Sequence, residues 1–221
     1  MDAKFTKALQ EQVNRAIVVL KRGGIVAYPT DTVYGLGAGM TSLAAVERIF
    51  RVKDRPKGMA LPLLVADAEQ VRQVARSIPE AAWRLIAEFM PGALTIVLLK
   101  SSSVPDVVTA GGGTIAVRIP DHPVPLALIT GLGKPIVGTS ANLSGHPSAL
   151  TAAEVQVQIG DNVDLIIDGG RCPGGIESTV VDFTTETPVI RRAGAIPLEL
   201  LKSALPEIEI AQEVTDAHRR G

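Results

Sequence analysis

Side chains that can bind anions recur in this sequence directly after short apolar segments. Arginine and lysine supply fixed positive charge, and arginine can hold a phosphate or a carboxylate through two parallel hydrogen bonds. Hydroxyl and amide groups add neutral donors and acceptors. This combination predicts a site that positions an anionic ligand and neutralises its charge, which is the usual logic of phosphoryl or nucleotidyl transfer. The candidates are Thr30, Asp31, Thr32, Lys53, Arg55, Arg118, Ser140, Asn142, Glu177, Ser178, Thr179, Arg191 and Arg192.

Arg118 is the most informative candidate because it lies in the strongly apolar segment Thr114–Ile119. A partly buried guanidinium needs an anionic partner, so we expect an anion beside it. Each of the other cations, taken alone, is more typical of a solvated surface group. The stretch Tyr28–Gly37 adds hydroxyls and glycines at a strand end, where open α/β sheets commonly bind ligands. We expect a loop there, in which Gly35 and Gly37 let the backbone come close to the ligand.

Other kinds of catalytic site are poorly supported. The three histidines, His122, His146 and His218, lack the spacing of zinc ligands, and Cys172 is the single cysteine. Ser140 does not lie in the Gly-x-Ser-x-Gly turn of serine hydrolases. Neither of the two common glycine-rich nucleotide-binding loops is present. A nucleotide would therefore bind outside these designs.

The composition is that of a globular protein, with 46% hydrophobic and 20% charged residues. The 22 basic side chains nearly balance the 23 acidic ones, so there is no overall basic field for nucleic acid. Aromatic residues make up only 3%, so stacking platforms for single-stranded RNA are scarce. A single cysteine, no signal-peptide core and no apolar run approaching about 18 residues together predict a cytoplasmic protein without membrane contact.

Helical and strand patterns alternate along the chain without a strict β-α-β order. They predict an α/β fold: a single-domain, open, twisted, mixed sheet with flanking helices. We expect this domain over residues 1–205, followed by a polar C-terminal tail over residues 206–221. Helices are predicted at 5–22, 42–52, 67–75, 79–90, 124–130 and 151–159 and from Pro197 onward, and strands at Ile25–Tyr28, Leu61–Val65, Leu94–Leu99, Thr114–Ile119, Ile136–Thr139, Leu165–Asp168, Thr179–Phe183 and Pro188–Arg191.

A series of short motifs resembles a known family. In chain order they read PTDTVYGLG, KDRP, AVRIP, TSANLSG, GIESTVVD and RRAG. This series is similar to the YrdC-like family of L-threonylcarbamoyladenylate synthases in its short form, over a core of about residues 12–200. The resemblance implies a nucleotidyltransferase that makes threonylcarbamoyl-AMP and pyrophosphate from L-threonine, bicarbonate or CO₂, and ATP. It also implies Mg²⁺ held through the ATP phosphates rather than by protein ligands, downstream proteins that transfer the threonylcarbamoyl group to tRNA, and at most weak tRNA contact.

The resemblance further assigns roles to individual residues. Met59 departs from the polar residue often found at its position, so an ATP contact there would come from the backbone. Thr30 and Asp31 are explained nearly as well by capping as by ligand binding. The implied L-threonine contacts are Thr32, Arg118, Gly138 and Ser178, the ATP contacts are Arg55, Met59, Thr114, Ser140, Ser148 and Arg192, and the catalytic residues are Lys53, Arg55, Ser140 and Asn142.

Two alternatives stand beside this reading. The first is an RNA-binding module of the same fold without turnover, which the balanced charge and scarce aromatics disfavour. The second is a related carbamoyl-adenylating enzyme, like the YrdC-like module of hydrogenase maturation factors. That module works beside an acylphosphatase-like domain and zinc-finger segments, for which one cysteine and 221 residues leave no room.

Overall fold

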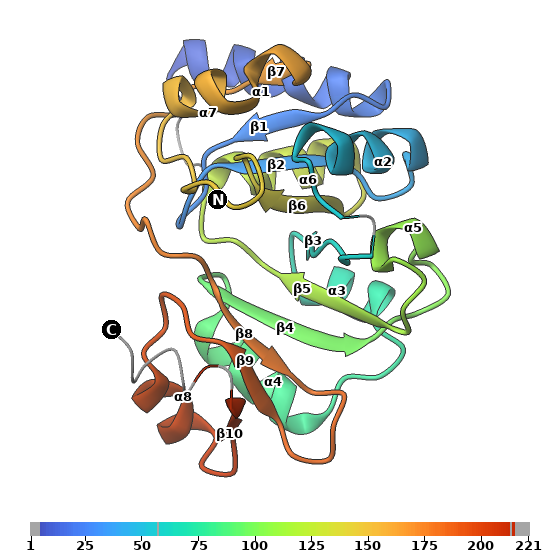
Figure 1. The fold of residues 1–221 in the computed structure, drawn as a ribbon, viewed down its shortest axis with the longest axis vertical. Coiled ribbons are helices and arrows are strands. Elements are labelled where there is room, and N and C mark those ends of the chain that lie inside the picture. Colours follow the sequence, from blue (N-terminus) through green and yellow to red (C-terminus); the bar gives the residue numbers. More distant parts are fainter. Residues whose placement is uncertain (1–4, 57, 213, 215–221) are drawn as a thin grey trace.

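The computed structural model describes residues 5–56, 58–212 and 214. Within them ten strands form one sheet in the order β10-β9-β8-β4-β5-β3-β6-β2-β1-β7 (Figure 1). Parallel and antiparallel pairs are mixed, since β4 runs antiparallel to β5 and parallel to β8. The predicted α/β fold with one open mixed sheet is therefore confirmed. The strands are β1 (Val26–Tyr28), β2 (Gly35–Gly39), β3 (Leu63–Leu64), β4 (Leu94–Leu99), β5 (Thr114–Arg118), β6 (Ile136–Ser140), β7 (Leu165–Ile166), β8 (Thr179–Asp182), β9 (Val189–Arg192) and β10 (Glu209–Ile210).

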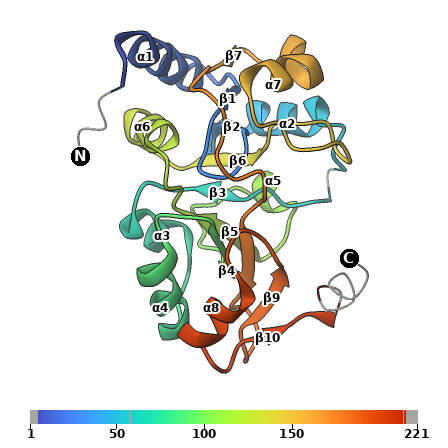
Figure 2. The ribbon, with the colours of Figure 1, turned by 90° about the vertical axis from the view of Figure 1, so that its left-hand side faces the viewer.

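Helices cover both faces of the half of the sheet that contains β1, β2 and β6. Figure 2 shows α1 and α6 on one side of these strands and α2 and α7 on the other. No helix of the described part is long and apolar enough to cross a membrane. The helices are α1 (Lys7–Lys21), α2 (Leu43–Val52), α3 (Ala68–Val74), α4 (Glu80–Phe89), α5 (Asp106–Thr109), α6 (Pro123–Leu132), α7 (Ala152–Ile159) and α8 (Leu198–Ala204), with a 3-10 turn at Gly160–Asn162.

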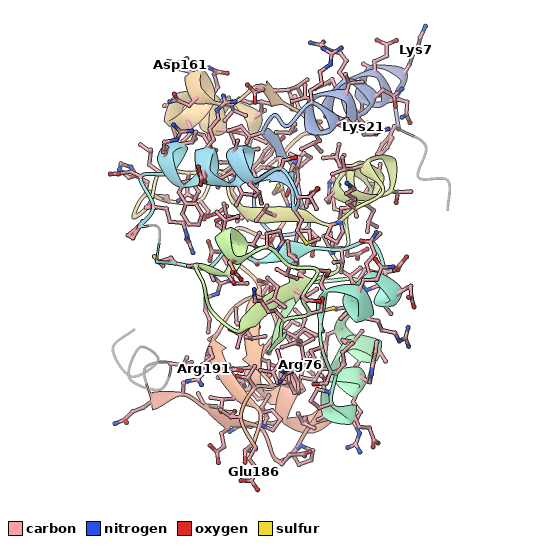
Figure 3. All side chains as sticks on the ribbon, turned by 90° about the vertical axis from the view of Figure 1, so that its right-hand side faces the viewer. Lys7, Lys21, Arg76, Asp161, Glu186 and Arg191 are labelled. Atoms are coloured by element: carbon pink, nitrogen blue, oxygen red, sulfur yellow. The ribbon has the colours of Figure 1, made fainter. Side chains whose placement is uncertain are left out.

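Two hydrophobic clusters correspond to the two faces of the sheet. Residues from α1 and α6 pack with Val26, Tyr28, Leu64 and Ile136 in the smaller cluster. Residues from the other helices pack in the larger cluster, against the alternate positions of the strands. Charged side chains such as Lys7, Lys21, Asp161 and Glu186 project outward at the two ends of the molecule (Figure 3). The apolar periodicity of the sequence thus sets which side of each element faces the sheet.

Strand register brings the polar candidates to a single face of the sheet. Paired residues point to the same side, and successive residues of a strand alternate. Tyr28 is paired with Gly35, Gly35 with Ser140, and Leu64 with Arg118. Along each strand, every second residue counted from these paired residues points to the same side of the sheet. We call it the cavity face, and it carries Tyr28, Gly35, Gly37, Gly138, Ser140, Leu64, Thr95, Arg118, Ser178 and Arg192.

The segment Gly35–Gly39 is a strand and not the loop expected from its glycines. It pairs with β1 on one side and with β6 on the other. Backbone hydrogen bonds to these two strands therefore stabilise it as a strand, although its residues are mostly glycine. A Cβ on Gly35 would lie 2.8 Å from Cε2 of Tyr28, and a Cβ on Gly37 would lie 2.8 Å from its hydroxyl oxygen. The ring of Tyr28 therefore occupies the space beside these two glycines, and the expected approach of a ligand to their backbone stays a prediction.

Gly37→Ala should lower the free energy of unfolding by about 2–3 kcal/mol. The new Cβ would lie 2.6 Å from the carbonyl oxygen of Val137, which belongs to the neighbouring strand and cannot rotate away. Denaturant unfolding measures the effect. Gly113→Ala is the matched control, because nothing lies within 4 Å of its Cβ position. Equal stability of the two variants would contradict the packing argument.

The C-terminal segment is a second difference from the sequence prediction. Glu209–Ile210 forms β10 and pairs in parallel with β9, and Ile208 is buried. The expected polar tail from residue 206 is thus wrong for residues 208–210, because Ile208 is buried and residues 209–210 add an edge strand to the sheet. The rest of the predicted tail beyond residue 214, with His218, lies outside the described residues. The short helix α5 was not predicted, and β3 and β7 are shorter than expected.

Candidate active site

A cavity of about 180 Å³ lies on the cavity face. It is smaller than the roughly 300–1,000 Å³ of pockets for drug-sized ligands, so it suits a molecule of amino-acid size. Its wall combines guanidinium groups, hydroxyls and a carboxylate. The lining residues are Tyr28, Thr30, Thr32, Val33, Tyr34, Gly35, Arg55, Pro62, Leu64, Thr95, Arg118, Gly138, Thr139, Ser140, Glu177, Ser178 and Arg192.

Arg118 ends β5 with its side chain almost fully buried in the cavity wall. Its Nε donates to the carbonyl oxygen of Gly92 at 2.9 Å, and its Nη1 donates to Oγ1 of Thr32 at 3.1 Å. Its Nη2 donates to Oδ1 of Asp31 at 2.7 Å. Asp31 is therefore the anionic partner that a buried guanidinium requires. These bonds use three of the five N–H groups and fix the plane of the guanidinium.

The loop that carries Thr32 is shaped by its own hydroxyl groups. Oγ1 of Thr30 donates to the carbonyl oxygen of Val33 at 2.7 Å and lies 3.1 Å from Oγ1 of Thr32. The backbone N–H of Gly175 donates to the carbonyl oxygen of Thr32 at 3.0 Å, which ties a second loop to the first. Thr30 thus stabilises the turn, as capping would, while Thr32 directs its hydroxyl toward Arg118.

Ser178 and Arg192 join the cavity wall across the hairpin of β8 and β9. The hydroxyl groups of Ser178 and Thr95 lie 2.7 Å apart. Nη2 of Arg192 donates to the carbonyl oxygen of Ser178 at 2.9 Å and to its hydroxyl oxygen at 3.2 Å. These bonds hold both residues in fixed orientations beside the cavity.

Glu177 is the carboxylate of the cavity wall. It accepts a hydrogen bond from Oγ of Ser148 at 3.2 Å and forms an ion pair with Arg192. Arg55, which also lines the cavity, donates to the carbonyl oxygens of Met59 at 3.5 Å and Ala60 at 3.0 Å. Burial lowers the pKa of Arg55, and the charge of Glu177 opposes that shift. Positive charge therefore gathers around one carboxylate on this side of the cavity.

Lys53 connects the end of α2 to the loop after β6, with only 2% of its surface exposed. Its Nζ donates to the carbonyl oxygens of Ser140 at 2.5 Å and Asn142 at 2.7 Å, and to Oδ1 of Asn142 at 3.3 Å. The amide nitrogen of Asn142 donates to the carbonyl oxygen of His146 at 2.7 Å. Lys53 and Asn142 thus hold the Ser140 loop from behind.

Lys53→Met should remove a pH dependence of stability. Burial, reinforced by the charge of Arg55, lowers the pKa of Lys53 from 10.5 to about 8. Between these values the unfolded chain binds a proton that the folded chain does not, so the free energy of unfolding should rise with pH from 8 to 10.5. The slope contributed by Lys53 is at most about 1.4 kcal/mol per pH unit. Denaturant titrations of both proteins across this range measure it, and equal slopes would contradict the prediction.

Seven residues with predicted roles line the cavity together, although they come from six separate segments of the chain. The strand register and the loop contacts described above account for their proximity. They are Thr32, Arg55, Arg118, Gly138, Ser140, Ser178 and Arg192.

The other predicted site residues lie outside the lining. Lys53 and Asn142 lie behind the Ser140 loop, and Ser148 reaches the cavity through its bond to Glu177. Met59 is half exposed and offers its carbonyl oxygen to Arg55. Thr114 lies on the cavity face, but at the opposite end of β5 from Arg118, about 13 Å along the strand.

Sequence reasoning assigned no role to Tyr28 or Thr95, which the structure places in the cavity wall. Tyr28 is fully buried, and its hydroxyl is the buried side-chain group without a hydrogen-bond partner among the described residues. Burial raises the pKa of its phenol. Thr95 could have been found from the alternation of β4, where it interrupts a series of apolar residues. Tyr28 gave no signal, because a tyrosine at a strand end is equally typical of a core.

Metal-binding groups are a separate question. No cluster of three or more His, Cys, Asp or Glu side chains in the described ranges is arranged to hold a metal ion. The carboxylate of Glu177 is already engaged by Arg192. The described side chains thus offer a metal ion few direct ligands. A Mg²⁺ ion bound to phosphate would complete its coordination mainly with water.

The fold and the cavity define a protein in which an open mixed sheet carries a small cavity lined by guanidinium and hydroxyl groups. The family model Sua5_yciO_yrdC, described as "Telomere recombination", matches residues 18–194. The chain therefore belongs to the Sua5/YciO/YrdC family.

Individual relatives agree with this assignment. The chain is 45% identical over 191 residues to threonylcarbamoyl-AMP synthase of Pyrococcus abyssi, covering 86% of this chain and 56% of the relative. It is 39% identical over 210 residues to threonylcarbamoyl-AMP synthase of Bacillus subtilis, covering 95% of this chain and 61% of the relative. A crystal structure of P. abyssi Sua5 complexed with L-threonine matches with a TM-score of 0.88 at 44% identity, covering 90% of this chain and 58% of that one. The chain thus spans a little over half the length of these proteins.

Proposed function

We propose that this chain synthesises L-threonylcarbamoyl-AMP and pyrophosphate from L-threonine, bicarbonate or CO₂, and ATP. Two relatives at 39% and 45% identity carry the name threonylcarbamoyl-AMP synthase, and the similar P. abyssi structure contains L-threonine. The observation in this chain that carries the proposal is the fixed guanidinium of Arg118 in a cavity of amino-acid size.

L-Threonine fits the chemistry of one end of the cavity. Arg118 binds the carboxylate, because its orientation is set by Asp31 and Gly92 and a guanidinium matches a carboxylate in shape and charge. The hydroxyls of Thr32 and Ser178 supply hydrogen bonds beside it, and the backbone of Gly138 forms part of the same cavity wall. The amine of threonine then attacks CO₂ to give N-carboxythreonine, held in place by the same contacts.

ATP occupies the other end of the cavity and extends along the open part of the cavity face. Arg55 and Arg192 neutralise phosphate charge, and Ser140 and Ser148 add hydroxyl donors. Thr114 lies farther along the same face, where the rest of the nucleotide contacts it. The carbamate oxygen attacks the α-phosphorus in line, pyrophosphate leaves, and the arginines stabilise the charge that develops.

Lys53, Asn142 and Met59 support this arrangement in different ways. Lys53 and Asn142 act by holding the Ser140 loop rigid, and Met59 acts through its carbonyl oxygen on Arg55. Mg²⁺ enters as part of the substrate, bound to the ATP phosphates. Its charge adds to that of Arg55 and Arg192 without a protein ligand of its own.

An omission assay tests the proposed function. Pyrophosphate release should require L-threonine, bicarbonate and ATP together, and mass spectrometry should identify threonylcarbamoyl-AMP as the product. Pyrophosphate release without threonine or bicarbonate would overturn the proposal. RNA binding without any such dependence would favour the RNA-binding alternative, and a requirement for carbamoyl phosphate would favour the related carbamoyl-adenylating enzyme.

The product needs an acceptor, because a mixed anhydride of a carbamate and AMP is reactive. We place this reaction in the cytoplasm, upstream of proteins that transfer the threonylcarbamoyl group to tRNA. Transfer to tRNA should therefore fail with this chain alone and proceed when a transfer system is added. Transfer by the chain alone would overturn this part of the proposal.

A further inference from the structure

Glu177 has a role that the proposed reaction does not explain. Its carboxylate lies in the cavity wall among groups on the nucleotide side. Ser148 and Arg192 both bond to it, and its negative charge raises the pKa of Arg55 and of Lys53 against the effect of burial. A carboxylate at the centre of hydroxyl and cationic groups makes the same kind of contacts as a phosphate oxygen.

We propose that Glu177 is an internal competitor for the phosphates of ATP and thereby sets how tightly the site binds ATP and pyrophosphate. This inference rests on the proposed function. A phosphate that approaches Arg192 and Ser148 has to replace the bonds that both residues make to Glu177. The same negative charge repels an incoming phosphate, and solvent around the partly exposed Glu177 and Arg192 side chains moderates that repulsion. Glu177 thus weakens the binding of ATP and speeds the release of pyrophosphate.

A role for Glu177 as the partner of the threonine amine fits the contacts less well. Its oxygens are already engaged by Ser148 and Arg192. Both of these residues belong to the nucleotide side of the cavity, whereas Arg118 and Thr32 mark the other end. The two roles predict different kinetics, since competition with phosphate affects ATP and an amine contact affects threonine.

Calorimetric titration of ATP and of pyrophosphate, without threonine or bicarbonate, tests the inference on Glu177→Gln. Glutamine keeps the shape of the side chain and an oxygen for Arg192, but removes the charge. Both dissociation constants should fall by roughly two- to fivefold, which is the scale of one partly exposed ion pair. In steady state, the KM for ATP should fall, inhibition by pyrophosphate should strengthen, and the KM for threonine should not change.

Asp182→Asn is the matched control. Asp182 pairs with Arg191 at 3.1 Å in the same hairpin, and neither residue lines the cavity. ATP affinity should be unchanged in this variant, so equal tightening in both variants would show a bulk charge effect and overturn the inference. Unchanged or weaker binding of ATP and pyrophosphate to Glu177→Gln, or a raised KM for threonine, would also overturn it. Wild-type protein that binds no ATP would instead refute the proposed function.

Discussion

Arg118→Ala should raise the KM for L-threonine by about 10²- to 10³-fold while changing the KM for ATP little, because a buried, hydrogen-bonded charge contact is worth about 2–5 kcal/mol. The proposed function assigns this guanidinium to the threonine carboxylate, and its orientation depends on Asp31, Thr32 and Gly92. Steady-state kinetics with threonine and ATP varied separately measure the two effects. An unchanged threonine requirement would show that the two substrates are divided differently between the ends of the cavity.

Stability has to be separated from binding in this experiment. Removing the guanidinium leaves Asp31 as a partly buried charge without its partner, which costs about 3–5 kcal/mol when such a pair is broken. The double variant Arg118→Met/Asp31→Asn removes both charges and should recover most of the unfolding free energy. Its threonine KM should stay as high as that of Arg118→Ala. Recovery of threonine affinity in the double variant would show that the loss came from folding alone.

Arg55→Ala should raise the KM for ATP by about 10- to 100-fold, because a hydrogen bond to a charged group contributes about 1.5–3 kcal/mol. Arg55 lines the cavity, and its side chain donates to backbone oxygens and to no carboxylate among the described hydrogen bonds. The proposed function assigns this charge to the ATP phosphates. Kinetics at saturating threonine measure the effect.

Arg51→Ala is the control for this variant. Arg51 lies in the last turn of α2, four residues before Arg55, is exposed and does not line the cavity. It tests whether a loss of ATP affinity comes from net charge or from the position of Arg55. Equal effects of the two substitutions would contradict a specific phosphate contact.

Elements whose own residue types indicate burial could be predicted from the sequence. Leu94–Leu99 is a strand with the predicted bounds, because its residues are β-branched or large and apolar. The need of Arg118 for an anionic partner was also predictable, because burying an unpaired cation in an apolar strand is unfavourable. The fold class followed from the alternation of such segments.

Features that depend on long-range pairing were missed. Gly35–Gly39 has no side-chain pattern, and only its backbone bonds to β1 and β6 make it a strand. Asp31 was present in the sequence, but nothing local relates it to Arg118, 87 residues away. The contacts of Glu177 form across a hairpin and a separate loop, so their convergence appears only when the sheet is assembled.

The glycines that pack against Tyr28, which are Gly35, Gly37 and Gly138, restrict how the cavity can be redesigned. Gly37 and Gly138 cannot gain even a methyl group without collision, because their Cβ positions lie within 2.6–2.7 Å of Val137 and Leu64. Variation at the glycines therefore cannot reshape this wall gradually. The ring of Tyr28 is the removable part, and shortening it would enlarge the cavity over an intact strand. If the proposed function holds, acceptance of amino acids bulkier than threonine is most directly engineered at Tyr28, whose side chain makes no hydrogen bond in the described structure.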